Sequence, residues 1–232
     1  HEYYYWRDQI SRRLIEDRGF NFIAVEGDFA SLYELNRYIK NKEGAAKSAR
    51  DVLSKLNRWP TWMWANEEVV ALAEWLRSYN DKLAEEDKIG FYGMDVYDEW
   101  HSKSEVLRML EGHDEIILKY VQTQYDCFNP YKGQSWEYAR AVKRGRRACA
   151  KATKEVVNFI RDQRHKFDGL SDDEYFYLLQ NALIVHNAEE FYRESIASRN
   201  STSWNSRVFH MHSTISDLFS LYGEDAKGIV WA

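Results

Sequence analysis

The chain has 232 residues and a net charge of −5, from 32 Lys and Arg against 37 Asp and Glu. It has no basic excess and no apolar run near the roughly 18 residues that span a bilayer, so we expect neither a nucleic-acid nor a membrane partner. Its two cysteines exclude a disulfide framework and a four-cysteine zinc site. Its aromatic content of 16% fits either a packed aromatic core or a wide pocket for a bulky, partly apolar ligand.

The first half of the chain alternates helical and strand patterns. Tyr3, Arg7, Ile10 and Leu14 recur at helical spacing and predict an opening helix with these residues on one apolar stripe. The continuous apolar run 21–25 predicts a strand that is covered on both faces. A helix is expected at 31–40, and another that ends at about 57. A third is expected at 67–79, after the capping residue Asn66, and a second strand follows at 88–93.

The second half is helical from about 102 to 221. Ser102 with Glu105, and Ser171 with Glu174, have the spacing of capping boxes. Between them we expect one long basic helix over 135–165, whose cationic run at 143–147 is interpreted as a solvated face. The remaining predicted elements are a helix at 172–198, a last helix striped by Trp204, Arg207, Val208, Met211, Ile215 and Leu218, and a strand at 228–232.

Three strands separated by helices predict parallel pairing through helical crossovers. We therefore expect an α/β fold in which a small parallel sheet is wrapped by helices, with a large helical insertion at about 102–200. The chain opens without methionine and ends within a strand pattern. We expect it to be a single domain over 1–232 that is truncated at both ends, and to be cytoplasmic.

Acidic residues follow two of the predicted strands: Glu26 and Asp28 after the first, and Asp95 after the second. Ligands of open parallel sheets bind beyond the carboxyl ends of the strands. A buried carboxylate needs a cationic or hydrogen-bonding partner, and Arg7, on the stripe of the preceding helix, is the natural candidate. Such a pair is either part of a binding site or a structural ion pair, and the spacing does not decide between them.

The histidines show no metal-binding spacing. His210 lies one turn after Arg207 on the last helix, where a structural role competes with a catalytic one, while His186 is expected to pack and His212 to be solvated. We expect no metal and no cofactor.

Two other groups leave alternatives open. Cys127 and Cys149 either meet across a helical hairpin or remain buried thiols. Trp59, Trp62 and Trp64 either pack against the sheet or stack on a sugar or an apolar ring.

Eight segments, taken together and in this order, resemble the erythromycin esterase-like family. They cover nearly the whole chain and are EYYYWRDQI (2–10), FIAVEGD (22–28), WPTWMW (59–64), GFYGMDVY (90–97), QNA (180–182), SWNSR (203–207), HM (210–211) and VWA (230–232). The resemblance implies a parallel α/β core with helical additions and a hydrolase site at the strand ends. The best-known members of the family open the lactone ring of macrolide antibiotics, which confers resistance.

The resemblance also assigns roles to residues. Arg7, Glu26 and His210 match family site residues, whereas Val208 stands where the family commonly has an aspartate. The family's general base is a histidine in a Gly-Glu-x-x-His-Gly segment, which by alignment would precede His1. A second histidine element would follow Ala232, so we expect these 232 residues alone to be nearly inactive. The expected substrate-binding residues are Asp28, Trp62, Trp64, Asp95, Tyr97 and Arg207.

Three functions therefore compete. The first is a metal-independent ester or lactone hydrolase that acts on a small-molecule, macrolide-like substrate. The second is a metal-assisted hydrolase with Glu26, Asp28 or Asp95 as oxygen ligands. The third is a non-catalytic scaffold that binds a glycosylated or polyketide ligand through its tryptophans.

Overall fold

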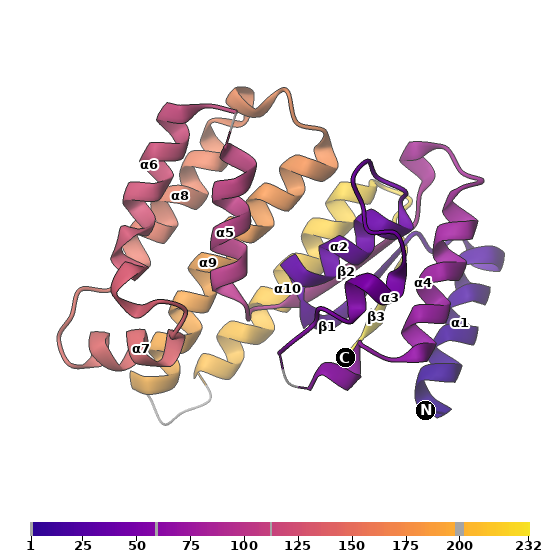
Figure 1. The fold of residues 1–232 in the computed structure, drawn as a ribbon, viewed down its shortest axis with the longest axis horizontal. Helices are drawn as coiled ribbons and strands as arrows, with labels where there is room; N and C mark the ends of the chain where they lie inside the picture. Colours follow the sequence, from indigo (N-terminus) through magenta and orange to yellow (C-terminus); the bar gives the residue numbers. More distant parts are fainter. Residues whose placement is uncertain (1, 59, 112, 198–201) are drawn as a thin grey trace. The chain divides into compact units, whose positions relative to one another are not determined.

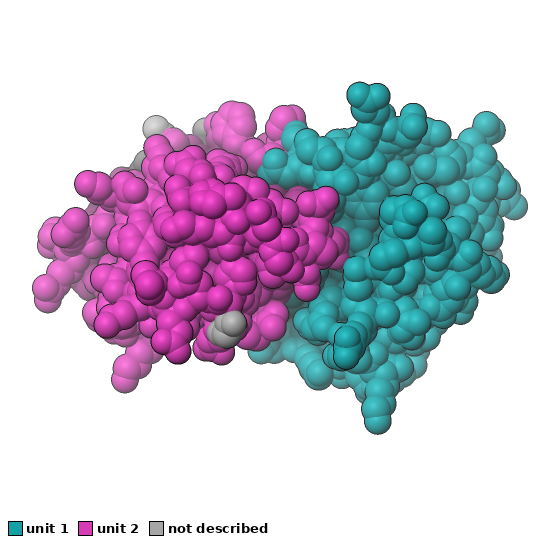
Figure 2. Space-filling view, turned by 90° about the horizontal axis from the view of Figure 1, so that it is seen from above, with its two compact units in different colours: residues 1–94, 215–232 teal, residues 95–214 magenta. Residues whose placement is uncertain are grey.

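The structure is a computed structural model that describes residues 2–58, 60–111, 113–197 and 202–232. Its internal contacts divide the chain into two compact units (Figure 2). Unit 1 comprises His1–Met94 and Ile215–Ala232, and unit 2 comprises Asp95–Thr214. The prediction of one domain that continues beyond both ends stays a prediction.

Unit 1 is built around a small sheet of three strands, β1 (Phe22–Asp28), β2 (Gly90–Asp95) and β3 (Gly228–Trp231) (Figure 1). The strands are parallel and lie in the order β2-β1-β3, with Val25 of β1 opposite Trp231 of β3. All three predicted strands are therefore present, and the expected α/β class with a small parallel sheet wrapped by helices is confirmed.

The apolar runs form strands because helices cover the sheet. Phe22, Ile23, Ala24 and Val25 are fully buried, which suits a central parallel strand. A Cβ atom on Gly93 would lie 2.5 Å from the carbonyl oxygen of Gly27, so only glycine fits at this point of β2.

The helices of unit 1 lie where the sequence pattern predicts them, except that the helix expected up to 57 ends at Leu53. The Asn66 side chain accepts a hydrogen bond from the backbone N–H of Val69, as expected for a capping residue. The elements are α1 (Glu2–Arg18), α2 (Phe29–Ile39), α3 (Ala49–Leu53), α4 (Glu67–Asn80) and the 3-10 turns η1 (Thr61–Met63) and η2 (Glu85–Asp87).

The predicted apolar stripe of α1 is wrong at Tyr3 and Ile10, whereas Leu14 packs against the core as expected. Tyr3 is 84% exposed and Ile10 is 54% exposed, whereas Asp8 and Ser11 are buried. Arg12 makes this possible, because its Nε donates a hydrogen bond of 2.7 Å to Asp8 Oδ1 and so satisfies the inward-facing carboxylate.

Unit 2 is helical (Figure 1). The capping box at Ser171 is confirmed, because the Glu174 carboxylate accepts from the Ser171 N–H while the Ser171 hydroxyl accepts from the Glu174 N–H. The other predicted box is wrong, since Ser102 lies inside a helix that begins at Glu99. The elements are α5 (Glu99–Leu110), α6 (Glu115–Tyr125), η3 (Asp126–Tyr131), α7 (Ser135–Lys143), α8 (Ala150–Asp162), η4 (Arg164–Phe167), α9 (Asp172–Ala197) and α10 (Thr202–Tyr222), the last of which ends in unit 1.

The expected long basic helix is two helices. Gly145 has a φ of 98°, a left-handed conformation that glycine adopts readily, and it ends α7 before α8 begins at Ala150. The stripe predicted for α10 is also shifted: Trp204 and Val208 are exposed, and the buried positions are Arg207, His210, Thr214 and Leu218.

A disulfide joins Cys127 of η3 to Cys149, which directly precedes α8. Of the two alternatives for the cysteines, the structure therefore has the paired one. Within the described ranges no helix combines the length and the apolar character that crossing a membrane requires.

Candidate active site at the carboxyl end of the sheet

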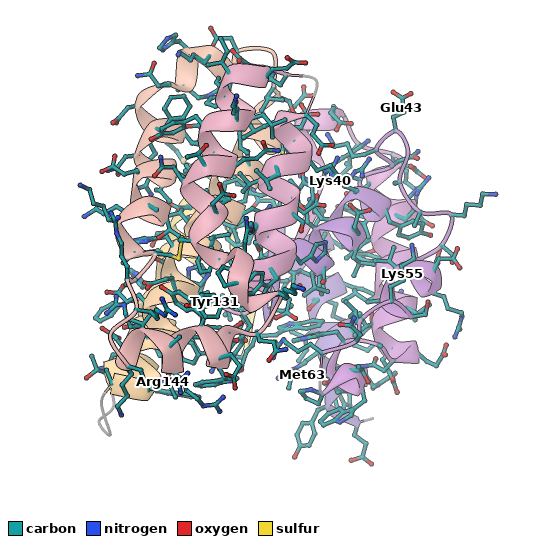
Figure 3. The ribbon with its side chains drawn as sticks, turned by 60° about the vertical axis from the view of Figure 1, so that its left-hand side comes forward. Lys40, Glu43, Lys55, Met63, Tyr131 and Arg144 are labelled. Carbon is teal, nitrogen blue, oxygen red and sulfur yellow. A yellow bond between two sulfur atoms is a disulfide. The ribbon has the colours of Figure 1, made fainter. Side chains whose placement is uncertain are left out.

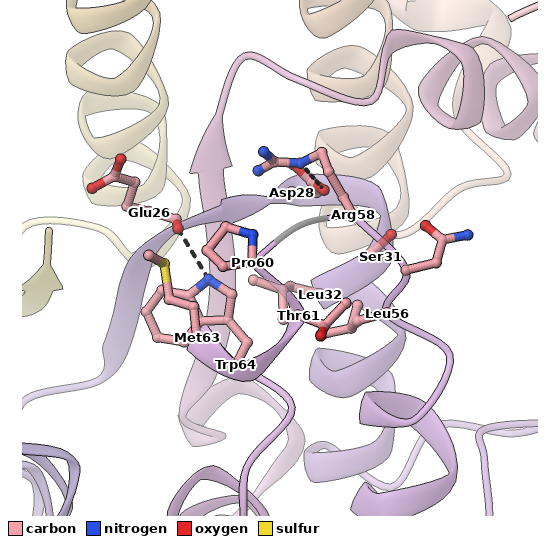
Figure 4. Close-up of a pocket in the computed structure, with 11 residues that line it drawn as sticks. Glu26, Asp28, Ser31, Leu32, Leu56, Arg58, Pro60, Thr61, Met63 and Trp64 are labelled. Carbon is pink, nitrogen blue, oxygen red and sulfur yellow. Dashed lines mark hydrogen bonds and ion pairs between the residues drawn. The ribbon is translucent and has the colours of Figure 1, made fainter. Parts of the chain in front are cut away.

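The carboxyl end of β1 borders a small cavity in unit 1 (Figure 4). The cavity has a volume of about 40 Å³, which holds a water molecule or two but no organic ligand of ordinary size. Its walls come from β1, α2 and the segment that leads into η1. The lining residues are Glu26, Asp28, Ser31, Leu32, Leu56, Asn57, Arg58, Pro60, Thr61, Met63 and Trp64.

Asp28, an expected substrate-binding residue, forms an ion pair with Arg58. The Nε atom of Arg58 donates to Oδ1 at 2.8 Å and to Oδ2 at 2.6 Å. The Arg58 side chain is 41% exposed and that of Asp28 is 11% exposed, so the pair borders the cavity and also faces solvent. Arg58 was not predicted from the sequence, because it lies outside any periodic element and 30 positions from its partner.

Glu26 lies at the same strand end and is half-buried. Its backbone carbonyl accepts a hydrogen bond of 3.0 Å from the indole Nε1–H of Trp64. In Figure 4 its carboxylate points away from the Asp28–Arg58 pair. The two acids at the end of β1 therefore face different surroundings although they are two residues apart.

Trp64 packs as a core residue and links β1 to β3 at the carboxyl end of the sheet. It is buried and stacks on Trp231 of β3 with ring centroids 6.2 Å apart. A Cβ atom on Gly27 would lie 2.8 Å from Trp64 Nε1, so the indole uses the space that this glycine leaves open. Trp62, in contrast, is 60% exposed, and Trp59 lies outside the described residues.

Arg7 reaches the end of β3 from α1. Its guanidinium lies 5.6 Å from the ring of Trp231 and donates a hydrogen bond of 3.4 Å to the carbonyl oxygen of Ala232. Because Val25 pairs with Trp231, the next residues along the two strands are Glu26 and Ala232. Arg7 thus contacts the residue that neighbours Glu26 at the carboxyl end of the sheet, and an ion pair between Arg7 and Glu26 stays a prediction.

The remaining expected site residues form a second group, in unit 2. Asp95 ends β2 and is buried with Arg207, whose Nε and Nη2 each donate to one carboxylate oxygen at 2.8 Å. The Arg207 guanidinium also lies over the rings of Tyr97 at 5.2 Å and Trp204 at 4.9 Å. This bidentate, stacked arrangement holds the α10 side chain to the residue that ends β2.

His210 belongs to this second group and is buried. The Asn187 amide donates to its Nδ1 at 2.9 Å, and its Nε2 has no hydrogen-bond partner among the described residues. Burial lowers its pKa to about 4, against the weaker opposing effect of Asp95. The imidazole is therefore neutral at physiological pH and a weak base, which favours the structural interpretation.

The two other histidines discussed above lie as expected. His186 is partly buried and its Nδ1 contacts the hydroxyl of Thr153 at 2.9 Å. His212 is exposed.

Glu99, which was not among the residues predicted from the sequence, is an acid with a raised pKa. It lies in the first turn of α5, is buried, and accepts a hydrogen bond from the Ser135 hydroxyl. Burial raises its pKa to about 7, although the hydrogen bond from Ser135 acts in the opposite direction. No periodicity reveals such a residue, because acids at a helix start are ordinarily exposed.

The metal-assisted alternative lacks a ligand set in the part of the chain that the structure describes. No group of three or more His, Cys, Asp or Glu residues there is arranged to hold a metal ion. Glu26, Asp28 and Asp95 do not form one.

Three solved structures share this fold. One is a succinoglycan biosynthesis protein (18% identity, TM-score 0.68), and this chain covers 52% of it with 97% of its own length. A second is a protein from Bacillus cereus (18% identity, TM-score 0.72). The match includes 100% of this chain and 53% of the Bacillus cereus protein. A mutant of erythromycin esterase EreC in its open conformation has 13% identity and a TM-score of 0.61, with 97% of this chain covering 56% of that one.

The chain thus spans about half the length of the structures it matches. The family model described as erythromycin esterase matches residues 15–232, which include β1, β2 and β3 and all expected site residues except Arg7. On this match over most of its length, the chain belongs to the erythromycin esterase family.

Proposed function

We propose that the chain forms part of the active site of a carboxylic ester hydrolase that opens esters or lactones, with macrolide lactones as the best candidate substrates. One observation carries the proposal: the Arg7 guanidinium, from α1, contacts Ala232, and Ala232 and Glu26 directly follow the paired residues Trp231 and Val25 of the sheet. Family membership supports the reaction class.

The reaction is the attack of water on the ester carbonyl carbon. The new carbon–oxygen bond forms as the water proton passes to a histidine base, which in this proposal belongs to a segment that precedes His1. The carbonyl oxygen becomes an oxyanion, the bond to the alcohol oxygen breaks, and the alcohol takes up a proton. A carboxylic acid and an alcohol result, joined in one molecule when the substrate is a lactone.

Each candidate site residue of unit 1 has a role in this proposal. Glu26 orients the base through a hydrogen bond, and Arg7 favours the oxyanion through its positive charge. Asp28 and Arg58 border the cavity and hold polar groups of the substrate, while the exposed Trp62 contacts its apolar part. The cavity of about 40 Å³ admits a water molecule but not a macrolide, so the bulk of the substrate would lie outside it.

Site variants test the proposal. Hydrolysis of a macrolide lactone and of an activated aryl ester is measured for residues 1–232 and for a longer chain that includes the flanking histidine segments. In the longer chain, Glu26→Gln and Arg7→Lys are expected to lower kcat/KM by about 100-fold or more. The matched controls Glu16→Gln and Arg13→Lys, at exposed positions of α1, should retain activity.

Two results would contradict the proposal. The first is full activity of the Glu26→Gln variant, which would remove this residue from the site. The second is strong turnover by residues 1–232 alone, which would mean that the base lies within them.

The exposure of Trp62 supports a second candidate, a scaffold that binds a glycosylated or polyketide ligand without turnover. In the longer chain this function predicts saturable macrolide binding, measured by tryptophan fluorescence, together with no hydrolysis product after prolonged incubation. It further predicts that Trp62→Ala weakens binding while Glu26→Gln leaves binding unchanged.

A further inference from the structure

The strongest charge asymmetry in the chain is a cationic segment of unit 2. Residues 140–154 contain seven Lys and Arg and no Asp or Glu. Since the whole chain carries −5 and this segment +7, all other residues together carry −12. We call the seven side chains the basic patch; they are Arg140, Lys143, Arg144, Arg146, Arg147, Lys151 and Lys154.

The structure places these cations in and around the link between α7 and α8, which contains Gly145 (Arg144 is labelled in Figure 3). All seven residues are exposed. Arg140 pairs with Glu137, and Lys143 donates to the carbonyl oxygen of Ile196. The other five form no ion pair with any residue that the structure describes, so their charge is not neutralised within this part of the chain.

Two further features accompany the basic patch: a helix N-terminus, which adds positive potential, and an exposed indole. The basic patch flanks the N-terminus of α8, where the helix dipole is positive and the first turn has no acidic residue. Trp136, 44% exposed, lies one turn before Arg140 and two turns before Lys143, on the same face of α7. An exposed indole beside several cations is typical of surfaces that contact the headgroup region of a bilayer.

We propose that the basic patch, with Trp136 at its margin, binds the surface of an anionic phospholipid bilayer. The guanidinium and ammonium groups contact lipid phosphates, and the indole enters the interfacial layer. A bilayer meets a folded protein at one face, whereas a long nucleic acid would extend from the basic patch over a chain whose other residues carry −12. This peripheral contact departs from our expectation of no membrane partner, which rested on the net charge of the whole chain.

Vesicle co-sedimentation tests this proposal with the 232-residue protein. Vesicles of phosphatidylcholine with 40% phosphatidylglycerol should bind it, pure phosphatidylcholine vesicles should not, and 0.5 M NaCl should release it. The Arg144→Gln/Arg146→Gln/Arg147→Gln variant should bind about 100-fold more weakly, at about fivefold per charge. Trp136→Phe should weaken binding and remove part of the fluorescence change seen on vesicle addition.

A matched control keeps the test independent of net charge. The Arg13→Gln/Lys55→Gln/Lys82→Gln variant removes three exposed cations outside the basic patch and should bind like the parent protein. Equal losses in the two triple variants would overturn the proposal. Salt-sensitive binding to a single-stranded oligonucleotide without vesicle binding would also overturn it and assign the surface to nucleic acid.

Discussion

Two neighbouring strands of this chain end in an acid that pairs with an arginine, and the two pairs differ in burial. Asp28, the last residue of β1, pairs with Arg58 beside a cavity, and the Arg58 side chain is 41% exposed. Asp95, the last residue of β2, pairs with Arg207, and these side chains are only 2% and 8% exposed. Pairs of the same chemistry therefore differ in what they can do. The buried Asp95–Arg207 pair joins parts of the structure, whereas the Asp28–Arg58 pair remains accessible to a ligand.

The largest expected effect is the loss of the buried pair. Arg207→Met leaves the Asp95 carboxylate buried without its bidentate partner, so the free energy of unfolding should fall by about 3–5 kcal/mol. Urea unfolding followed by circular dichroism measures this loss. A loss below 1 kcal/mol would remove the distinction between the two pairs.

The disulfide lies wholly within unit 2, so its removal allows the stability of unit 2 to be compared with that of unit 1. Replacing both Cys127 and Cys149 by serine should lower the free energy of unfolding by about 3 kcal/mol, the loop-closure value for a separation of 22 residues. Hydrogen exchange of the variant should quicken in α6 and α8 and stay unchanged in β1. Equal acceleration in the sheet would show that the two units unfold as one.

Glu99 provides a pH-dependent test of burial in unit 2. Its pKa rises from 4.5 to about 7 on folding, so the unfolded chain ionises first as the pH increases. Stability should therefore fall between pH 4.5 and 7 and then level off, a loss on the order of 3 kcal/mol.

Replacement of this carboxyl isolates its contribution. Glu99→Gln should be about as stable as the parent at pH 4 and more stable at pH 8, as measured by urea unfolding at each pH. Glu155→Gln, at an exposed position of α8, should follow the parent at both values. A Glu99→Gln variant that is less stable than the parent at pH 8 would refute the burial argument.

The smallest expected effect belongs to the exposed pair. Arg58→Met should change the free energy of unfolding by about 1 kcal/mol or less, because the Arg58 side chain is 41% exposed and water can take its place beside Asp28. In the longer chain the same variant should raise KM for a macrolide more than it lowers kcat. A stability loss equal to that of Arg207→Met would make the Asp28–Arg58 pair structural.

Local patterns predicted much of this fold. The three apolar runs became strands, Asn66 caps α4, and Ser171 caps α9 with Glu174, because each of these features depends on residues that are close in sequence. Asp95 was a candidate because it follows a predicted strand, and Arg207 because the family resemblance includes it, but their pairing was not predicted.

Features that depend on tertiary packing were not predictable in this way. The buried face of α1 carries Asp8 because Arg12 satisfies it, while Tyr3 and Ile10 of the predicted stripe are exposed. Arg58 lies in a loop without periodicity, and its role depends on a strand end 30 positions earlier. The pKa of Glu99 depends on its burial, which spacing does not reveal.

The central claim is that Glu26 and Arg7 act together at the carboxyl edge of the sheet. A double-mutant cycle on kcat/KM for a macrolide lactone, in the chain that includes the flanking histidine segments, tests it most directly. We predict that Glu26→Gln/Arg7→Lys loses about as much activity as either single variant, because each change disables the same arrangement. Losses that multiply in the double variant would show that the two residues act independently, and would contradict the claim.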